Sequence, residues 1–174
     1  MNQDELLSEC ERLRTFETLD ECHEHLQRLV DHLGFKSYLY GVLPNRRNSL
    51  DFEPRSTFDP TWLDYYVDKG LAQVDGVLKR CQQPDAQLIL WRNVERHMTP
   101  AQRTTYRQAV EAGCTNGVTL SMKSHVGVTG AFSVTSEGSA EEALRLLESR
   151  HHALGMISYA FNDAVYGGHQ LSEV

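Results

Sequence analysis

Apolar residues near the start of the chain recur at intervals of three and four, which is the pattern of amphipathic helices. This pattern predicts a short first helix over Leu6–Leu13. A second helix is predicted to begin after Thr18, because Thr18 and Glu21 have the spacing of a capping box, and to end at Gly34. The chain is therefore expected to open with two helices.

After Gly34 the pattern changes to that of β-strands. Aromatic and β-branched residues predict a strand from Phe35 to Leu43 and a second one within Leu50 to Phe58. Three further strands are expected later, and a turn near Gly127 joins the last two. They span Gln87 to Trp91, Gly117 to Lys123, and Gly130 to Thr135.

Further helices are predicted over residues 59–70 and 99–113. Each begins with an N-cap residue followed by proline at the first helical position, and these pairs are Asp59-Pro60 and Thr99-Pro100. One or two helical turns are expected over Asp75–Cys81. Strands and helices therefore alternate through the middle of the chain.

The last predicted element is a long amphipathic helix from Ser139 to Val165. Helices thus precede, separate and follow about five strands, and this order is typical of an α+β fold. We expect a three-layer α-β-α sandwich with a central antiparallel sheet, similar to GAF and PAS domains. A gap between such a sheet and its helices is a natural place for a small apolar ligand.

Composition narrows the functional classes. The 174 residues carry a formal net charge of -7, with 40% apolar residues, which suits one globular domain over residues 1–168 followed by a linker or tail over 169–174. No apolar run approaches the roughly 20 residues of a membrane helix, and the acidic N-terminus is unlike a secretory signal. Because cations are not clustered, DNA binding by this chain itself is disfavoured.

Cysteine and histidine residues are weak indicators of chemistry here. The four cysteines have no CxxC spacing, which predicts reduced thiols in the cytoplasm. His23 and His25 diverge on a helix, so we interpret them as a solvated face and expect no metal. A thiolate pair of Cys81 or Cys114 with His125 would make an enzyme, but no local motif supports it.

The window from Phe58 to Trp91 holds much of the aromatic content. Trp62 and Tyr66 are four residues apart, so a helix presents both on one face. An indole donates, a phenol donates and accepts, and the Asp75 carboxylate accepts. Together they suit a ligand with two carbonyls and one amide N–H, although spacing alone favours an ordinary aromatic core.

This window resembles the N-terminal ligand-binding domain of LuxR-type quorum-sensing regulators, which bind acyl-homoserine lactones. The resemblance rests on Trp62, Tyr66, Asp75, Trp91 and Gly117 in their order and spacing. Supporting similarity lies in the strand over 39–44 and the strand pair over 117–120 and 130–133, so it spans roughly residues 5–165. It implies a sensor domain rather than an enzyme, without a cofactor.

The resemblance also implies roles for single residues. Trp62 would donate to the lactone carbonyl, and Asp75 would accept the amide N–H. Tyr66 and Ser133 would bind the acyl amide oxygen, and Trp91 would form a wall at the lactone. The other expected pocket residues are Phe58, Leu39, Gly41, Leu43, Val77, Leu78, Cys114, Thr119 and Ala131.

Two positions depart from the family pattern. Gly76 stands where a proline usually follows the aspartate, and Phe58 stands where several relatives carry a tyrosine. Neither change removes the donors and the acceptor, because Trp62, Tyr66 and Asp75 are all present. A lactone ligand therefore remains the expected one, with a GAF- or PAS-like sensor for a different small molecule as the alternative.

Partners are implied by the resemblance as well. A homodimer that includes the long C-terminal helix is expected, since this helix is long for covering a sheet alone; the alternative is that its apolar stripe only serves the core. DNA would be bound only by a C-terminal helix-turn-helix domain of about 60 further residues, as family members have, which is not found in this sequence. The chain is then either a domain of a larger regulator or a short form that inactivates a full-length partner.

Overall fold

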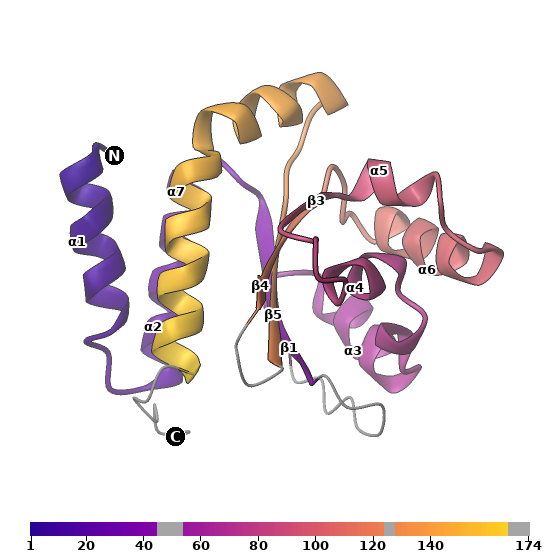
Figure 1. Cartoon of the computed structure of the whole chain (residues 1–174), viewed down its shortest axis with the longest axis horizontal. Helices are drawn as coiled ribbons and strands as arrows, with labels where there is room; N and C mark the ends of the chain where they lie inside the picture. The colour runs from indigo at the N-terminus through magenta and orange to yellow at the C-terminus, as the bar shows by residue number, and fades with distance from the viewer. Residues whose placement is uncertain (45–53, 124–127, 167–174) are drawn as a thin grey trace.

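The structure, a computed structural model, describes residues 1–44, 54–123 and 128–166. It has a five-stranded sheet between two layers of helices (Figure 1). The elements are α1 (Gln3–Leu13), α2 (Leu19–His32), β1 (Ser37–Pro44), β2 (Arg55–Ser56), α3 (Pro60–Asp68), the 3-10 helix η1 (Leu71–Gln73), α4 (Gly76–Cys81), β3 (Leu88–Leu90), α5 (Trp91–Glu95), α6 (Pro100–Glu111), β4 (Val118–Lys123), β5 (Val128–Thr135) and α7 (Ala140–Tyr166).

The strands lie in the order β2-β1-β5-β4-β3, and every neighbouring pair is antiparallel. Helices α1, α2 and α7 lie on one side of this sheet, and helices α3 to α6 lie on the other (Figure 1). The predicted α+β class, with a central antiparallel sheet of five strands between helical layers, is confirmed. The capping box of Thr18 and Glu21 is confirmed too, at the start of α2.

The two faces of the sheet carry side chains of different size. Leu39 pairs with Ser133, which pairs with Thr119, so these residues share one face. That face also holds the small residues Gly41, Ala131 and Ser121. The opposite face carries large residues, namely Tyr38, Tyr40, Leu120, Phe132 and Val134. The small side chains therefore leave space between the sheet and helices α3 to α6.

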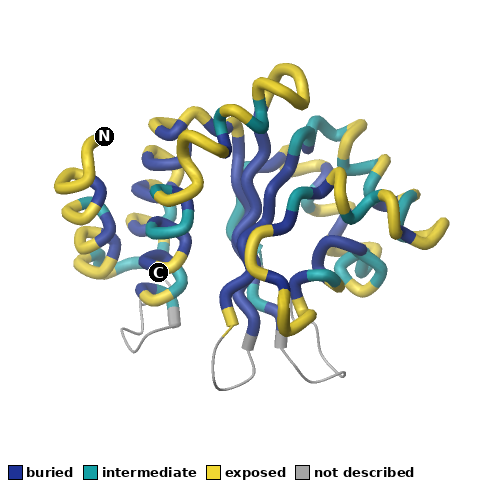
Figure 2. The backbone as a smooth tube through the Cα atoms, turned by 45° about the horizontal axis from the view of Figure 1, so that its top comes forward, coloured by how far each residue is buried: buried dark blue, intermediate teal, exposed yellow. Residues whose placement is uncertain are grey.

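The large face packs against α1, α2 and α7 in a dense core. Figure 2 shows the strands buried along most of their length. Side chains from all three helices are fully buried in this core, and they include Leu13, Leu26, Val30, Leu154, Ile157 and Phe161. A second cluster of buried side chains lies between the small face and helices α3 to α6.

One predicted strand ends earlier than its hydrophobic pattern suggests. The pattern predicts a strand through Trp91, but β3 ends at Leu90 and Trp91 begins helix α5, which was not predicted. The backbone N–H of Trp91 donates to Gly117 O at 3.0 Å, and the chain then turns away from the sheet. A short apolar run cannot show where a strand gives way to a helix.

Two other predictions fall partly outside the described residues. Of the strand predicted within 50–58, β2 covers only Arg55–Ser56, and residues 50–53 are not described. The turn predicted near Gly127 also lies outside the described residues.

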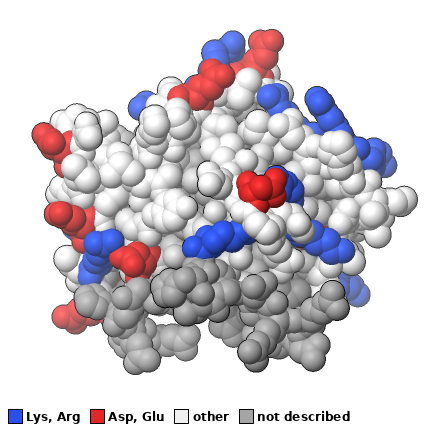
Figure 3. Space-filling model, viewed as in Figure 1, with Lys and Arg blue, Asp and Glu red and all other residues white. Residues whose placement is uncertain are grey.

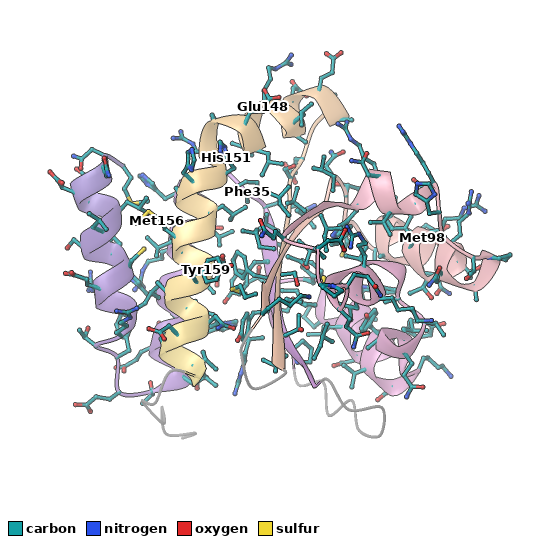
Figure 4. The ribbon with its side chains drawn as sticks, viewed as in Figure 1. Phe35, Met98, Glu148, His151, Met156 and Tyr159 are labelled. Atoms are coloured by element: carbon teal, nitrogen blue, oxygen red, sulfur yellow. The ribbon has the colours of Figure 1, made fainter. Side chains whose placement is uncertain are left out.

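Helix α7 bends near His151, so that its first part crosses the end of the sheet and its second part runs beside α1 and α2 (Figures 1 and 4). At the bend, Ser149 Oγ donates to Leu146 O at 2.8 Å, and His151 Nδ1 lies 2.9 Å from Glu148 O. Side chains that compete for helix carbonyls in this way loosen the backbone ladder and favour bending.

The apolar stripe of α7 is mostly used by the protein's own core. Leu147, Leu154, Ile157 and Phe161 are buried, whereas Ala140 is exposed. The stripe therefore supports the reading in which α7 covers its own sheet. Because α7 bends, its length gives no separate argument for a partner.

The prediction of a solvated face for His23 and His25 is wrong. His25 is only 4% exposed, and its Nε2 lies 2.7 Å from Glu9 Oε2 on α1. His23 contacts the hydroxyl of the buried Tyr38. Helix α1 covers α2 at His25 and strand β1 covers it at His23, which the pattern of a single helix cannot reveal. Among the described residues, no group of three or more His, Cys, Asp or Glu side chains is placed to hold a metal ion.

Charge is distributed unevenly over the surface. Figure 3 shows acidic side chains on the side of α1 and α2, and Lys and Arg side chains gathered on the side of α5 and α6. Arg92 on α5, Arg96 just after it and Arg107 on α6 are exposed. In the described part of the chain, no helix combines the length and apolarity needed to cross a membrane.

Candidate functional site

A pocket of about 580 Å³, partly open to solvent, lies between the small face of the sheet and helices α3 to α6. This volume counts the open mouth of the pocket together with its enclosed part. Its lining residues are Leu39, Phe58, Trp62, Leu63, Tyr66, Asp75, Val77, Leu78, Trp91, Thr105, Tyr106, Ala109 and Ser133.

Helix α3 places two aromatic side chains in one wall of the pocket. The helix begins with Asp59 as its N-cap, and the Asp59 carboxylate accepts the backbone N–H of Trp62 at 3.1 Å. Trp62 and Tyr66 follow one turn apart, with both side chains buried and their rings edge to face at 5.8 Å. In the described part of the chain, no hydrogen bond involves the Trp62 indole N–H, so this donor is available to a ligand.

Asp75 is held in place by bonds to both of its oxygens. Oδ1 accepts the backbone N–H groups of Val77 at 2.7 Å and Leu78 at 3.2 Å, which makes Asp75 the N-cap of α4. Oδ2 accepts the Tyr66 hydroxyl at 2.8 Å. Burial raises the pKa of Asp75 above its ordinary value, and the three hydrogen bonds oppose that rise. Burial also raises the pKa of Tyr66 well above its usual value, so its hydroxyl remains a donor to Asp75.

Gly76, which departs from the pattern of the resemblance, follows an aspartate that is held by hydrogen bonds on both oxygens. The two bonds from the start of α4 fix the Asp75 carboxylate without help from a proline ring. Gly76 is buried, and a Cβ at this position would lie 3.1 Å from Met98, which is labelled in Figure 4. The Met98 side chain therefore fills the space that a larger residue would need.

A second set of polar groups lies at the sheet side of the pocket. The Trp91 indole N–H donates to Thr119 Oγ1 at 2.8 Å, and Thr119 Oγ1 lies 2.8 Å from Ser133 Oγ. The Trp91 ring lies against Gly117, where an added Cβ would be only 2.1 Å from a ring atom. Glycine at 117 is therefore what allows the indole to lie here.

The structure brings most of the predicted site residues together. Nine line the pocket: Trp62, Tyr66, Asp75, Trp91, Ser133, Phe58, Leu39, Val77 and Leu78. Five predicted residues, Gly41, Leu43, Cys114, Thr119 and Ala131, do not line it. Of these, Leu43, Cys114 and Ala131 belong to the buried cluster around the pocket, and Thr119 lies beside Ser133 on the same face of the sheet.

Four pocket residues were not predicted: Leu63, Thr105, Tyr106 and Ala109. Three of them belong to α6, whose N-terminal signal was recognised while its inner face was not. The spacing of Thr105 and Ala109 by four residues places both on one side of this helix. Such spacing alone does not show that the side faces a cavity instead of a packed core.

The electrostatic character of the pocket restricts its ligand. Among the described residues that line the pocket, Asp75 is the one carboxylic acid, and none is Lys, Arg or His. A buried anionic ligand group would therefore meet a carboxylate and no cation, which is unfavourable. The pocket instead offers an indole donor, a carboxylate acceptor and a serine hydroxyl among apolar walls, which suits an uncharged ligand with carbonyl and N–H groups.

The cysteine residues do not resemble nucleophiles. Burial raises the pKa of the Cys81 thiol to about 12 and that of Cys114 to about 11, so neither is a thiolate at neutral pH. The proposed partner His125 lies outside the described residues.

Comparison with known proteins agrees with this geometry. The model of the autoinducer binding domain family matches residues 18–165. Two curated relatives named "Transcriptional activator protein TraR" are 25% identical: one from Agrobacterium vitis over 117 residues, covering 66% of this chain and 48% of the relative, and one from Rhizobium radiobacter over 122 residues, covering 68% and 50%. The chain thus spans about half the length of these relatives.

Solved structures show the same fold. A structure titled as the N-acylhomoserine lactone dependent LuxR family factor CepR2 from Burkholderia cenocepacia has a TM-score of 0.75 at 19% identity, covering 93% of this chain and 94% of that one. SdiA in complex with octanoyl-rac-glycerol has a TM-score of 0.71 at 14% identity, covering 98% and 69%. The ligand-binding domain of VqsR from Pseudomonas aeruginosa has a TM-score of 0.58 at 15% identity, covering 92% and 96%.

Proposed function

Because the chain belongs to the autoinducer-binding domain family of LuxR-type transcriptional regulators, we propose that its pocket binds an N-acyl-homoserine lactone. The family is one of ligand-sensing domains, not of enzymes, so the expected event is binding without conversion. The observation that carries this proposal is the pairing of an available indole donor at Trp62 with a fixed carboxylate acceptor at Asp75 across an apolar pocket.

The polar groups of such a ligand match those of the pocket. In this assignment Trp62 donates to the lactone carbonyl, and Asp75 accepts the amide N–H in a charge-assisted bond. The Tyr66 hydroxyl has one hydrogen, which it donates to Asp75 Oδ2. We therefore assign the amide oxygen to the hydroxyl of Ser133, with Tyr66 holding the carboxylate in position. Trp91 forms a wall beside the lactone ring.

The apolar walls suit the acyl chain. Leu39 from β1 and Val77 and Leu78 from α4 line the pocket, and the buried Leu43 and Ala131 extend the same apolar region along the sheet. Burial of an acyl chain among these groups supplies about 0.8 kcal/mol for each CH₂. A pocket emptied of such a chain loses packing contacts, so we further propose that ligand binding stabilises the folded domain.

Self-association is the second part of the proposal. We propose a homodimer in which the outer side of α7 takes part, because Tyr159 on that helix is 56% exposed, the largest exposure among the exposed large apolar side chains of the described residues (Figure 4). The curated relatives are transcriptional activators by name. For this chain we propose the sensing step, with DNA contact made by residues outside it.

Native mass spectrometry of protein expressed with and without added lactones tests the proposed ligand. We expect a complex whose added mass equals one intact N-acyl-homoserine lactone per chain. The ring-opened acyl-homoserine is the matched control, because it keeps the acyl chain and the amide but carries a carboxylate. With Asp75 in the pocket and no cation among the described lining residues, it should bind at least tenfold more weakly.

The alternatives give different results in the same experiment. A sensor for an unrelated molecule would retain a compound of other mass from the expression host and bind no lactone. A lactonase or acylase would release product of altered mass. Binding of the ring-opened compound as tightly as of the lactone would contradict the assignment of Asp75.

A further inference from the structure

A buried chain of three polar side chains connects the wall of the pocket to its floor. Trp91 Nε1 donates to Thr119 Oγ1 at 2.8 Å, and Thr119 Oγ1 lies 2.8 Å from Ser133 Oγ. Thr119 is fully buried and does not line the pocket, whereas Ser133 does. Thr119 therefore acts on a ligand through its two neighbours that line the pocket, and of these Ser133 carries the hydroxyl.

The chemistry of the three groups fixes the direction of these bonds. An indole N–H can only donate, so Thr119 Oγ1 is the acceptor from Trp91. Thr119 has one hydroxyl hydrogen, and its other hydrogen-bond partner among the described residues is Ser133 Oγ. If Ser133 donated to Thr119, the buried hydrogen of Thr119 would have no acceptor, which is unfavourable. The Trp91 and Thr119 hydrogens both have an acceptor when Trp91 donates to Thr119 and Thr119 donates to Ser133.

The Trp91 indole, the first of these three side chains, is held in one position. The backbone N–H of Trp91 donates to Gly117 O at 3.0 Å, and the Trp91 ring lies directly against Gly117. Thr119 and Ser133 face each other on the neighbouring strands β4 and β5, so their separation is fixed by the sheet. With one lone pair of Ser133 Oγ engaged by Thr119, the hydrogen of Ser133 is left for the pocket.

We propose that Thr119 is a positioning residue that makes Ser133 a hydrogen-bond donor toward the ligand. The inference rests on the proposed function and adds a rule of specificity to it: the ligand must place a strong acceptor, such as an amide carbonyl oxygen, opposite Ser133. A thiocarbonyl at the same position accepts hydrogen bonds weakly and is disfavoured.

The test compares two probes, N-octanoyl-homoserine lactone and its thioamide analogue, by titration calorimetry on the whole chain. The wild type should bind the amide about five to ten times more tightly, which corresponds to one net hydrogen bond. Thr119→Val keeps the shape of the side chain but removes its hydroxyl, and the preference should fall to about twofold or less. Thr119→Ser keeps the hydroxyl and should retain the preference.

Structural damage alone would weaken both probes equally and leave the ratio unchanged, so an unchanged ratio in a folded Thr119→Val variant would overturn the proposal. Ser133→Ala leaves the bond between Trp91 and Thr119 in place and should lose the preference to the same extent; retention of the preference there would also overturn it. Failure of the wild type to bind either probe would instead contradict the proposed ligand class.

Discussion

Asp75 performs two tasks with its two carboxylate oxygens. Oδ1 caps helix α4, and Oδ2 accepts the hydroxyl of Tyr66 at the pocket wall. Substitution by alanine would remove both, so its effect on binding could not be separated from the loss of a helix cap. Asparagine is an equally good N-cap residue, so this substitution keeps the cap of α4 and removes only the second carboxylate oxygen.

Asp75→Asn should therefore fold but bind the lactone more weakly. The cap requires the amide oxygen of Asn at the Oδ1 position, which places the NH₂ group opposite the Tyr66 hydroxyl and the ligand N–H. Because the NH₂ group cannot accept the ligand N–H, that buried N–H would lack a partner. The binding free energy for the lactone should therefore weaken by about 1–3 kcal/mol. Calorimetry measures the affinity and circular dichroism the fold; unchanged affinity in a folded variant would contradict the role of Asp75.

Gly117 and Gly155 form a matched pair for testing close packing. An alanine Cβ at Gly117 would lie 2.1 Å from the Trp91 ring, whereas at Gly155 the nearest atom would be Leu120 Cδ2 at 4.0 Å. Gly117→Ala should destabilise the domain by about 1–3 kcal/mol and weaken ligand binding, because the indole must move. Gly155→Ala lies inside helix α7 and should stabilise it by about 0.5–1 kcal/mol. Denaturant unfolding would refute this account if the two variants changed stability in the same direction.

At the scale of elements, helices α1 and α2 meet at a buried histidine. His25 lies against Glu9 and Arg12 from α1, and Arg28 lies beside it on α2. Burial is the main cause that lowers the pKa of His25 below its ordinary value, with Glu9 opposing it; burial also lowers the pKa of His23. The unfolded chain then binds more protons than the folded one just below pH 6.5.

The domain should accordingly lose stability as the pH falls from 7.5 to 5.5. The sign follows because a lowered histidine pKa in the folded state makes the free energy of unfolding rise with pH in this range. His25→Gln should reduce this dependence, and the remainder should come from His23. Urea unfolding at the two pH values measures it. An equal pH dependence in the wild type and in His25→Gln would show that the pair of helices is not the titrating element.

The sequence predicts most elements but not all of their surroundings. Strong local signals, such as the capping box at Thr18 and the prolines after Asp59 and Thr99, set the correct starts of α2, α3 and α6. The burial of His25 and the inner face of α6 depend on contacts with distant elements, which no local period reports. The same limit applies to the site. The resemblance to LuxR-type domains predicted Trp62, Tyr66 and Asp75, whereas predicting Tyr106 requires knowledge of which side of α6 faces the sheet.

At the scale of the whole molecule, the expected dimer can now be tested without damage to the core. Phe161 is fully buried, whereas Tyr159 is 56% exposed. Tyr159→Glu should therefore shift sedimentation equilibrium from dimer toward a monomer near 19.8 kDa while the melting temperature stays close to that of the wild type. Val110→Glu, at a 38% exposed residue of α6 in the other layer, is the control and should remain dimeric. A monomeric wild type at tens of micromolar with bound lactone would contradict the dimer.

The central claim is that the pocket between the sheet and helices α3 to α6 is completed by an acyl-homoserine lactone. Thermal unfolding at increasing concentrations of this ligand tests that claim most directly. A ligand that binds only the folded state should raise stability by about 2.7 kcal/mol at one hundred times its dissociation constant, so the melting temperature should climb by several degrees and keep rising with the logarithm of concentration. A melting temperature that stayed constant across a panel of lactones of different chain length would contradict the account.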